Sequence, residues 1–395
     1  MEIDPLERFD DTATAFRYKS DSELKRANFI FTVVNNPFIS KVSTSAVKLG
    51  MFLKLPIKGI VRSTVFQHFC GGETIERTEK TVKQLGDYNV KTILDYSIEG
   101  EKTEKGFDLT TEEVLNTFER AVQSHNIPFC VFKVTGLASA TLLEKIQSGL
   151  TLDKEEKNQF EKVRQRVDKI CSKAHATGIP VLVDAEETWI QSPIDMLAYE
   201  MMAKYNSQKA IVFNTFQLYR TDMLENLKMA FHSAAMHNYQ LGVKLVRGAY
   251  MEKEAARAEK SGYPNPIHAS KQLTDDAFNT ALSFCIDNKQ RISVVCGSHN
   301  EYSNHYLTLL MEKYNMKPND DHVWFAQLLG MSDNISFNLA KAGYNVAKYV
   351  PYGPVEAVMP YLLRRAAENT SVAGQSSREL SLIRKELTRR KNHKA

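Results

Sequence analysis

The sequence predicts an α/β protein, a (β/α)8 TIM-type barrel with an N-terminal helical arm. The first observation is a series of eight short β-rich runs within about 260 residues. The second is that longer segments of helical character separate most of the runs, which indicates parallel strands covered on both faces. An open doubly wound sheet is the alternative, but neither G-x-G-x-x-G after the first run nor G-x-x-x-x-G-K-[ST] is present. The runs lie at 90–97, 128–135, 179–186, 209–216, 241–248, 291–298, 322–329 and 345–352.

Polar residues near the ends of these runs are the third observation. In a barrel the carboxyl ends of the strands converge on one face, where the active sites of this fold lie. Buried strands have little other reason to finish this way so regularly, so the series predicts a functional site. The residues are Lys133, Asp184, Asn214, Arg247, His299, Gln327 and Tyr349.

Residues 1–85 are expected to form the helical arm, and 86–372 the barrel. Cap-type residues open the stretch 21–34, and a glycine pair precedes helical spacing in 71–85. Between them, 46–69 mixes apolar residues with lysine and arginine. Packing of the arm on the barrel is the simpler interpretation, and contact with a membrane surface is the alternative.

The segment 373–395 predicts a basic C-terminal helix. Leu380, Ile383 and Leu387 have the i, i+3, i+7 spacing of an apolar stripe. We expect the stripe to pack on the barrel, with a basic end that is either solvated or in contact with an anionic membrane. The basic residues are Arg378, Arg384, Lys385, Arg389, Arg390, Lys391 and Lys394.

The composition is that of a soluble globular protein and argues against several classes. The 395 residues carry a net charge of +4, too weak for nucleic acid to be the main partner. Five scattered cysteines without a C-x-x-C pair fit a reducing compartment and do not support structural zinc. The acidic N-terminus lacks a signal or transit pattern, and no apolar run approaches the roughly 18 residues of a spanning helix. We therefore expect a cytoplasmic protein, or one trimmed for an organelle matrix.

The stretch YLLRRAAENT at 361–370 places Arg364, Arg365 and Glu368 within about one helical turn. Apolar residues surround the arginine pair. A partly buried pair usually holds an anion, because guanidinium groups match carboxylate or phosphate in a bidentate way. An ion-pair network that ties this helix to the rest of the protein is an equal alternative.

The candidate site is cationic as a whole, which suggests anionic ligands. One interpretation is a Schiff-base lysine at position 133 of an aldolase-type barrel; the other is a phosphate-bearing cofactor beside a carboxylate substrate. A metal site has no close ligand pair to support it, although Asp184, Glu186 and His299 are candidate ligands, and the G-x-S-x-G motif of serine hydrolases is missing. The charged residues are Lys133, Lys244, Arg247, Arg364 and Arg365, against Asp184, Glu186, Glu187 and Glu368.

Five motifs together resemble the proline dehydrogenase family. The R-R-x-x-E-N ending is the most specific, and the Y-V-P-Y-G-P wording is similar to the single-function branch. The resemblance covers residues 86–372 and implies a distorted (β/α)8 barrel that binds FAD. The motifs are VDAEET (183–188), KLVRGAYMEKE (244–254), GSHN (297–300), YVPYGP (349–354) and YLLRRAAEN (361–369).

The resemblance also implies roles for individual residues. Arg364 and Arg365 would grip the carboxylate of L-proline together with Lys133. Asp184 would support the catalytic group, to which Lys244 also belongs. The other substrate contacts would be Tyr250, Leu328 and Tyr349, and the flavin contacts Asn214, Val246, Arg247, Gly248, Ser298, His299 and Asn300, with Glu368 bracing the arginines.

Two positions depart from the family pattern. The family often has an arginine close to the flavin's reactive nitrogen where this chain has Lys244, so the charge is kept and the planar fork is lost. The stretch FAQLLG at 325–330 replaces F-Q-x-L-H-G, which removes an imidazole and any acid–base role at that position.

The implied function is oxidation of L-proline to Δ1-pyrroline-5-carboxylate by hydride transfer to FAD, with electrons passed to a membrane quinone, as the first step of proline catabolism. The enzyme would be cytoplasmic and peripheral to the inner membrane in a bacterium, or on the matrix side of the inner membrane in a mitochondrion. Hydroxyproline dehydrogenase is the alternative within the family, and the bulk of Tyr349 argues against it. Outside the family, the alternatives are the aldolase barrel and a scaffold that binds acidic membranes.

Overall fold

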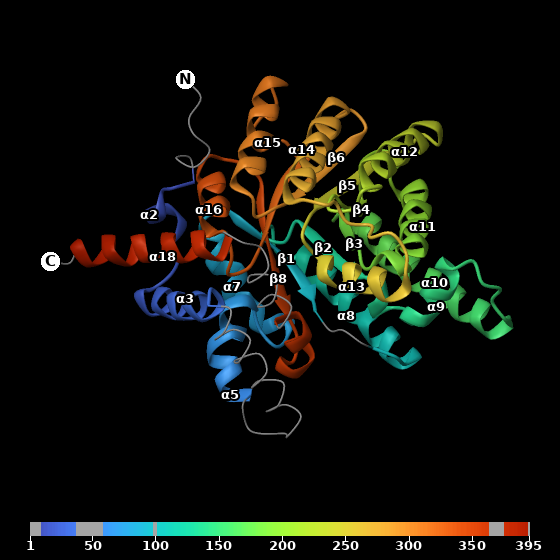
Figure 1. The fold of residues 1–395 in the computed structure, drawn as a ribbon, viewed down its shortest axis with the longest axis horizontal. Helices are drawn as coiled ribbons and strands as arrows, with labels where there is room; N and C mark the ends of the chain where they lie inside the picture. Colours follow the sequence, from blue (N-terminus) through green and yellow to red (C-terminus); the bar gives the residue numbers. More distant parts are fainter. Residues whose placement is uncertain (1–8, 37–57, 98–100, 363–374, 394–395) are drawn as a thin grey trace.

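Eight parallel strands close into a barrel in the computed structural model (Figure 1). β1 and β8 close it in register, from Val90 beside Val346 to Tyr96 beside Tyr352. The predicted fold class is confirmed, and every strand lies within its predicted run except β4, which extends by one residue to Gln217. The structure describes residues 9–36, 58–97, 101–362 and 375–393. The strands are β1 Val90–Tyr96, β2 Phe129–Lys133, β3 Val181–Asp184, β4 Val212–Gln217, β5 Leu241–Val246, β6 Ile292–Gly297, β7 Val323–Leu328 and β8 Val346–Tyr352.

Helices cover the outside of the barrel (Figure 1). They are α7 Ile75–Gly86, α8 Glu104–Val122, α9 Ala140–Gln147, α10 Lys154–Thr177, α11 Thr188–Tyr205, α12 Met223–Met236, α14 Lys271–Asp287, α15 Glu301–Lys313 and α16 Asp333–Lys341, with a 3-10 turn at Val134–Gly136. α13 Met251–Ser261 lies instead beside the start of α11, where Glu254 accepts the backbone N–H of Thr188 at 2.7 Å. Local sequence sets their ends. Asp153 and Glu156 form a capping box before α10, and Gly178 ends that helix with a φ of 72°.

Alternation along the strands separates two apolar layers. Val212 and Phe216 of β4 pack outward against the helices. Phe213, between them in sequence, packs inside the barrel with Ile93 and Val295. This period of two decides which strand residues can reach a site inside the barrel.

The two ends of the described chain pack on each other beside the barrel. The C-terminal helix α18 Gln375–Asn392 lies along α3 Asp21–Val34 (Figure 1). Leu380 and Ile383 are buried and Leu387 is partly buried in an apolar cluster shared with α3. The expected stripe is therefore present, but it packs mainly on the arm and not on the barrel. The other elements of the arm are α2 Thr12–Ala15, α5 Lys58–Val61, a π-helical turn Arg62–Phe66 and α6 Gln67–Phe69.

The helix before β1 and the helix after β8 depart from a regular barrel. α7 begins within the segment 1–85 and ends at Gly86, yet its side chains Ile75 and Val82 belong to the layer between strands and helices. Residues 355–362 follow β8 and are helical, but Val358 joins the apolar cluster of the arm. The arm and the barrel thus share one continuous packed body.

Candidate active site

Two lysines, an aspartate and a tyrosine meet inside the barrel. Lys133 Nζ donates to Asp184 Oδ2 at 2.7 Å, and Lys244 Nζ donates to the other oxygen of that carboxylate. Lys244 Nζ also donates to Tyr349 Oη at 2.8 Å. Register explains the first pair, because Lys133 and Asp184 are direct neighbours on β2 and β3. Asp95 lies 3.7 Å from Lys133 Nζ. We call Lys133, Asp184, Lys244 and Tyr349 the interior cluster.

The charges of the interior cluster stabilise one another. Burial raises the pKa of Asp184, but the two lysines outweigh it and hold that pKa at about 2. Burial lowers the pKa of Lys133, and Asp184 and Asp95 more than offset this, so the pKa lies well above its usual value. The pKa of Lys244 is lowered, since burial outweighs the attraction of Asp184. Lys133 is therefore a charged ammonium group with a bound counter-ion. This disfavours the aldolase alternative, in which the lysine must lose its proton before it attacks.

The loop after β5 borders the cluster with an open backbone surface. Gly248 has a φ of 91°, and a Cβ added there would meet nothing within 4 Å. Tyr250 has a φ of 62°, which is rare for a bulky residue and is kept only where the surroundings hold it. Tyr250 interacts electrostatically with Lys133. The loop therefore holds an aromatic ring next to the cluster and leaves room beside its glycine.

Arg247, at the end of β5, reaches toward α14 and α15. It forms an ion pair with Asp275, and its Nη2 donates to Ser298 Oγ at 3.0 Å and to Ser303 Oγ at 2.6 Å. The guanidinium carbon lies 3.8 Å from the centre of the Phe278 ring. Arg247 Nε is buried and has no hydrogen-bond partner among the described residues. One strong donor of this well-held side chain is thus left unused.

Ser298, His299 and Asn300 form the turn from β6 into α15. Ser298 Oγ accepts from the Asn300 N–H at 3.1 Å, and the Asn300 side chain caps the first turn of α15. His299 Nδ1 lies 2.9 Å from Ser332 Oγ, and its Nε2 lies 3.5 Å from the backbone nitrogen of Leu328. The structure therefore places this predicted turn at the same end of the barrel as Arg247.

Asn214 does not face the barrel interior. Its Nδ2 donates to Asp195 Oδ1 of α11 at 2.8 Å, in the outer layer. Asn214 lies on the outer face of β4, as do Val212 and Phe216, because alternate residues of a strand face the same side. The structure therefore does not support the predicted flavin contact of Asn214. Gln217 takes the inward place instead: it lies beside Val246 in register and donates to Glu186 O at 2.7 Å. The predicted run 209–216 stops one residue before Gln217, so the sequence pattern gives no signal for this residue.

Three predicted site residues, Arg364, Arg365 and Glu368, lie outside the described residues, and their roles stay predictions. In the part of the chain that the structure describes, no three His, Cys, Asp or Glu side chains are grouped to hold a metal ion.

Glu186 is a buried acid behind the interior cluster. Its carboxylate accepts the backbone N–H of Thr135 at 3.0 Å and the hydroxyl of the same residue. Burial is the largest influence and raises the pKa of Glu186 to about 7. The native state therefore keeps a proton on Glu186 at a pH where the unfolded chain has lost it.

The variant Glu186→Gln is expected to remove part of the pH dependence of stability. Between about pH 4.5 and about pH 7, each pH unit removes about 1.4 kcal/mol of unfolding free energy at such a site. The wild type should therefore lose stability relative to the variant as the pH rises through this window, and the difference should be constant above it. Denaturant unfolding at about pH 5 and about pH 7.5 measures this. An unchanged stability difference between the two pH values would contradict the raised pKa.

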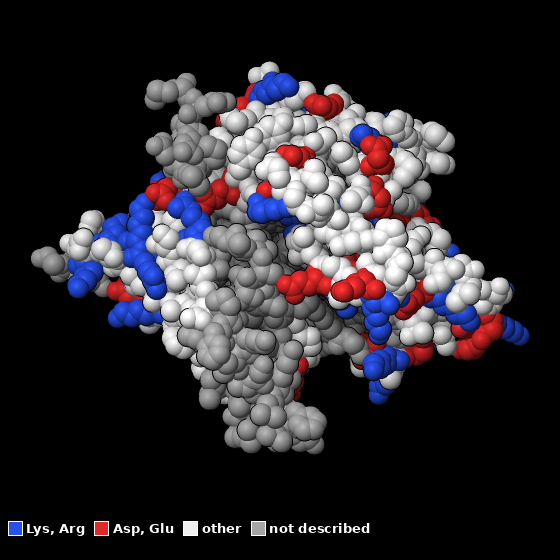
Figure 2. Space-filling model, viewed as in Figure 1, with Lys and Arg blue, Asp and Glu red and all other residues white. Residues whose placement is uncertain are grey.

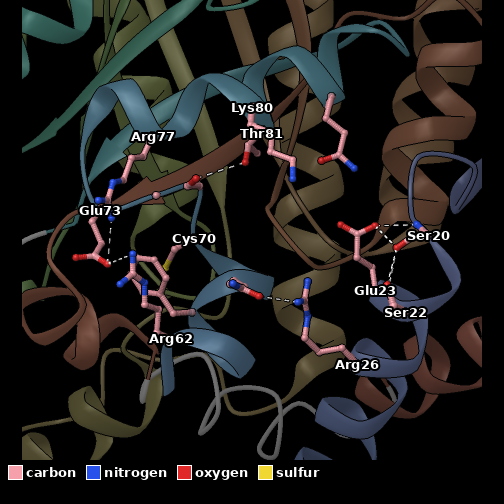
Figure 3. A pocket seen from close by; sticks show the side chains of 15 residues that line it. Ser20, Ser22, Glu23, Arg26, Arg62, Cys70, Glu73, Arg77, Lys80 and Thr81 are labelled. Carbon is pink, nitrogen blue, oxygen red and sulfur yellow. Dashed lines mark hydrogen bonds and ion pairs between the residues drawn. The ribbon is translucent and has the colours of Figure 1, made fainter. Parts of the chain in front are cut away.

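A separate hollow lies where the arm meets the barrel (Figure 3). Its volume is about 610 Å³, and its lining includes the cations Arg26, Arg62, Arg77 and Lys80. Glu73 pairs with Arg62 at 3.0 Å and with Arg77 at 3.7 Å, and Arg26 donates to Gln67 at 2.7 Å. This internal pairing is typical of a junction between packed elements, and none of the residues of the interior cluster lines the hollow.

The barrel and the interior cluster together define a class of protein. Cations that converge at the carboxyl ends of (β/α)8 strands are typical of enzymes that bind small anionic substrates.

Comparison with known proteins narrows the class to a family. The pattern of the family described as Proline dehydrogenase matches residues 78–378. Proline dehydrogenase 1, mitochondrial, of Dictyostelium discoideum is 34% identical over 428 aligned residues, which cover 96% of this chain and 74% of that protein. The carbapenem antibiotics biosynthesis protein CarD of Pectobacterium carotovorum is also 34% identical, over 84% of this chain and 86% of its own length. The chain belongs to the proline dehydrogenase family.

A solved structure supports the fold. Proline utilization A from Bdellovibrio bacteriovorus superposes with a TM-score of 0.74 at 20% sequence identity. The match covers 93% of this chain and 40% of that one, so this chain spans less than half of the larger protein.

Proposed function

We propose that this protein oxidises L-proline to Δ1-pyrroline-5-carboxylate, with FAD as its bound cofactor and a quinone as electron acceptor. The observation that carries the proposal is the interior cluster, in which Asp184 fixes Lys133 and Lys244 beside Tyr349. Membership of the family gives this arrangement its interpretation. A fixed positive charge next to a flat ring suits a small cyclic amino acid.

Lys133 is the described cation best placed for the carboxylate of the substrate. Its side chain is 20% exposed, whereas that of Lys244 is 5% exposed. We assign Arg364 and Arg365 as its companions, on the resemblance of their motif. Tyr349 packs against the substrate ring, and its hydrogen bond to Lys244 fixes the orientation of the phenol. Further lining residues are Tyr250 and Leu328.

The neighbouring residues fit a flavin nucleotide. Arg247 keeps an unused buried donor, and Gly248 leaves open space beside its backbone. The first turn of α15, which follows Asn300, favours a phosphate through its N-terminal dipole. FAD bound there would supply the acceptor for the hydride that leaves the substrate. We assign its contacts to Lys244, Val246, Arg247, Gly248, Ser298, His299 and Asn300, with Glu368 as a brace for the arginines.

The chain itself acts mainly by positioning the substrate. The carboxylate clamp holds the ring so that the carbon beside nitrogen is presented for hydride loss. The amine must be neutral at that moment, because a protonated secondary amine does not readily release hydride. Loss of hydride then forms the C=N bond, and the remaining proton on nitrogen leaves to water.

Anaerobic addition of L-proline to the purified protein tests this function. A bound flavin absorbs at about 450 nm, and L-proline should bleach that band. The variant Lys133→Met should keep the flavin and need a higher proline concentration for the same bleaching. A colourless protein, or a yellow one that L-proline does not bleach, would refute the proposal.

Substrate choice is expected to depend on Tyr349. The variant Tyr349→Ser should lose efficiency on L-proline and gain relative activity on trans-4-hydroxyproline, because removal of the ring opens space beside the substrate. The ratio of kcat/KM for the two substrates measures the effect. If that ratio does not rise, the ring does not exclude the 4-hydroxyl.

We also propose that α18 contacts an anionic membrane surface, where the quinone dissolves. Figure 2 shows Lys and Arg side chains gathered over α18. Several are occupied within the protein: Lys385 pairs with Asp10, and Glu386 pairs with the arginines at 389 and 390. Arg384 and Lys391 are exposed, and neither pairs with an acid among the described residues. Within those residues, no helix is both long and apolar enough to cross a bilayer.

This surface implies a location beside the inner membrane, on the cytoplasmic side in a bacterium or on the matrix side in a mitochondrion. The relatives in Dictyostelium discoideum and Arabidopsis thaliana are named as mitochondrial.

The double variant Arg384→Gln with Lys391→Gln is expected to bind anionic liposomes about 30-fold more weakly, since each basic residue near such a surface contributes about 1 kcal/mol. Activity with a soluble dye acceptor should persist. Arg389→Gln is the matched control, because that arginine is already held by Glu386 at 2.8 Å. Equal sedimentation of the double variant and the wild type at low salt would show that α18 only packs on the arm.

A further inference from the structure

The turn between β7 and α16 links the C-terminal helix to the barrel interior. Gly330 has a φ of 79°, and Ser332 has a φ of 50°. The left-handed conformation of a residue other than glycine costs about 1–3 kcal/mol and persists only where neighbours hold it. Ser332 is also 3% exposed, so its polar atoms need partners inside the protein.

Two residues outside its own helix hold Ser332, and they belong to different elements of the fold. Its backbone N–H donates to Glu379 Oε2 of α18 at 2.9 Å. Its hydroxyl lies 2.9 Å from His299 Nδ1, at the end of β6. Glu379 and His299 are therefore connected through one residue, although 80 positions separate them in the chain.

Glu379 is buried but has no ion pair of its own among the described residues. It is 5% exposed on α18, and a buried carboxylate without its own ion pair is unfavourable compared with an apolar residue of similar size. The described charges that act on it are Asp333, Lys19 and Lys348; burial first and then Asp333 raise the pKa of Glu379 to about 7. Glu386, the other buried acid of α18, differs because it pairs with two arginines of its own helix.

We propose that Glu379 is a positioning residue for the His299 side chain and acts through Ser332. The carboxylate holds the backbone of Ser332 in its left-handed conformation, and that conformation directs the hydroxyl at His299 Nδ1. The ring is then fixed with Nε2 toward the backbone of Leu328. The consequence for catalysis rests on the proposed function, in which His299 contacts the flavin and Leu328 the substrate. On this proposal α18 sets part of the active-site geometry from outside the barrel.

Three variants test the proposal. Glu379→Ala removes the acceptor for the Ser332 N–H, and Glu379→Gln keeps one. Glu386→Ala removes the other buried acid of the same helix without touching the turn. The direct readout is the imidazole signal of His299 in protein labelled with ¹⁵N-histidine, assigned by loss of the signal in His299→Gln. The second readout is kcat and KM for L-proline with a soluble dye acceptor, at equal flavin content.

We expect Glu379→Ala to shift the His299 signal and to lower kcat about 10-fold with a smaller change in KM, as small displacements at an active site do. Glu379→Gln should restore both. Glu386→Ala should lower the melting temperature and leave the His299 signal in place. If Glu379→Ala does not fold, Ser332→Ala removes only the hydroxyl and should shift the same signal.

The outcomes separate this inference from the proposed function. An unmoved His299 signal in Glu379→Ala, or in Ser332→Ala, overturns the positioning role whatever the activity. A shifted signal supports it even if the wild type does not oxidise L-proline, in which case only the proposed function fails.

Discussion

The variant Asp184→Asn is expected to lower kcat/KM for L-proline by about 100-fold or more and to lower the free energy of unfolding by about 3–5 kcal/mol. The side chain keeps its shape and loses its charge. Lys133 and Lys244 then remain inside the barrel with no carboxylate between them, and both were held by its two oxygens. A buried charge without a counter-ion is strongly destabilising, so the variant should lose both stability and the positions of the two lysines.

Two further variants separate charge from shape at Asp184. The double variant Asp184→Asn with Lys133→Met removes one unpaired charge and should recover part of the lost stability, but not the activity. Asp95→Asn is the control, because Asp95 is also buried and lies 3.7 Å from Lys133 Nζ, beyond hydrogen-bonding distance. Its effect on both quantities should be much smaller. If Asp184→Asn and Asp95→Asn lose similar amounts of activity and stability, the two lysines do not depend on Asp184.

The strands could be predicted because their information is local. A buried parallel strand is a short apolar run whatever surrounds it, and polar ends such as Lys133 and Asp184 mark the face where strands converge. The local sequence carries less information about which side of the strand a polar residue faces. Asn214 and Gln217 both lie in β4, and only the position of the strand relative to the barrel axis shows that Asn214 turns toward α11.

Contacts between segments that are distant in the chain could not be predicted from sequence patterns. Lys348 reads as one polar residue in an apolar run, and Asp333 as an ordinary first residue of a helix. The structure brings them together with Lys19 of the arm and Glu379 of α18. No spacing rule connects these four positions, because each belongs to a different segment of the chain and the contacts exist only after the barrel, the arm and α18 have packed.

Asp333 forms the most buried ion pair of the described chain, and its removal is expected to release the arm. Its carboxylate accepts Lys19 Nζ at 2.6 Å and Tyr18 Oη at 2.8 Å, and Lys348 Nζ lies 2.8 Å from its other oxygen. The side chains of Asp333 and Lys348 are both 0% exposed. Burial alone would raise the pKa of Asp333, but Lys19 and Lys348 hold it far below its usual range. This contribution to stability is therefore present above about pH 4 and is lost as the pH falls.

The variant Asp333→Asn should lower the free energy of unfolding by about 3–5 kcal/mol, because the fully buried Lys348 loses its paired carboxylate. The arm should also become open to protease, since Lys19 and Tyr18 lose their common partner on α16. Limited proteolysis with mass spectrometry would then report new cleavage in residues 9–36. Lys341→Gln is the matched control: its pair with Asp11, 3.1 Å apart, joins the same arm to the same helix, but its side chain is 61% exposed and such a pair contributes at most about 1 kcal/mol. Equal protection of the arm in both variants would mean that the apolar cluster around α3 and α18 holds the arm without help from the buried charges.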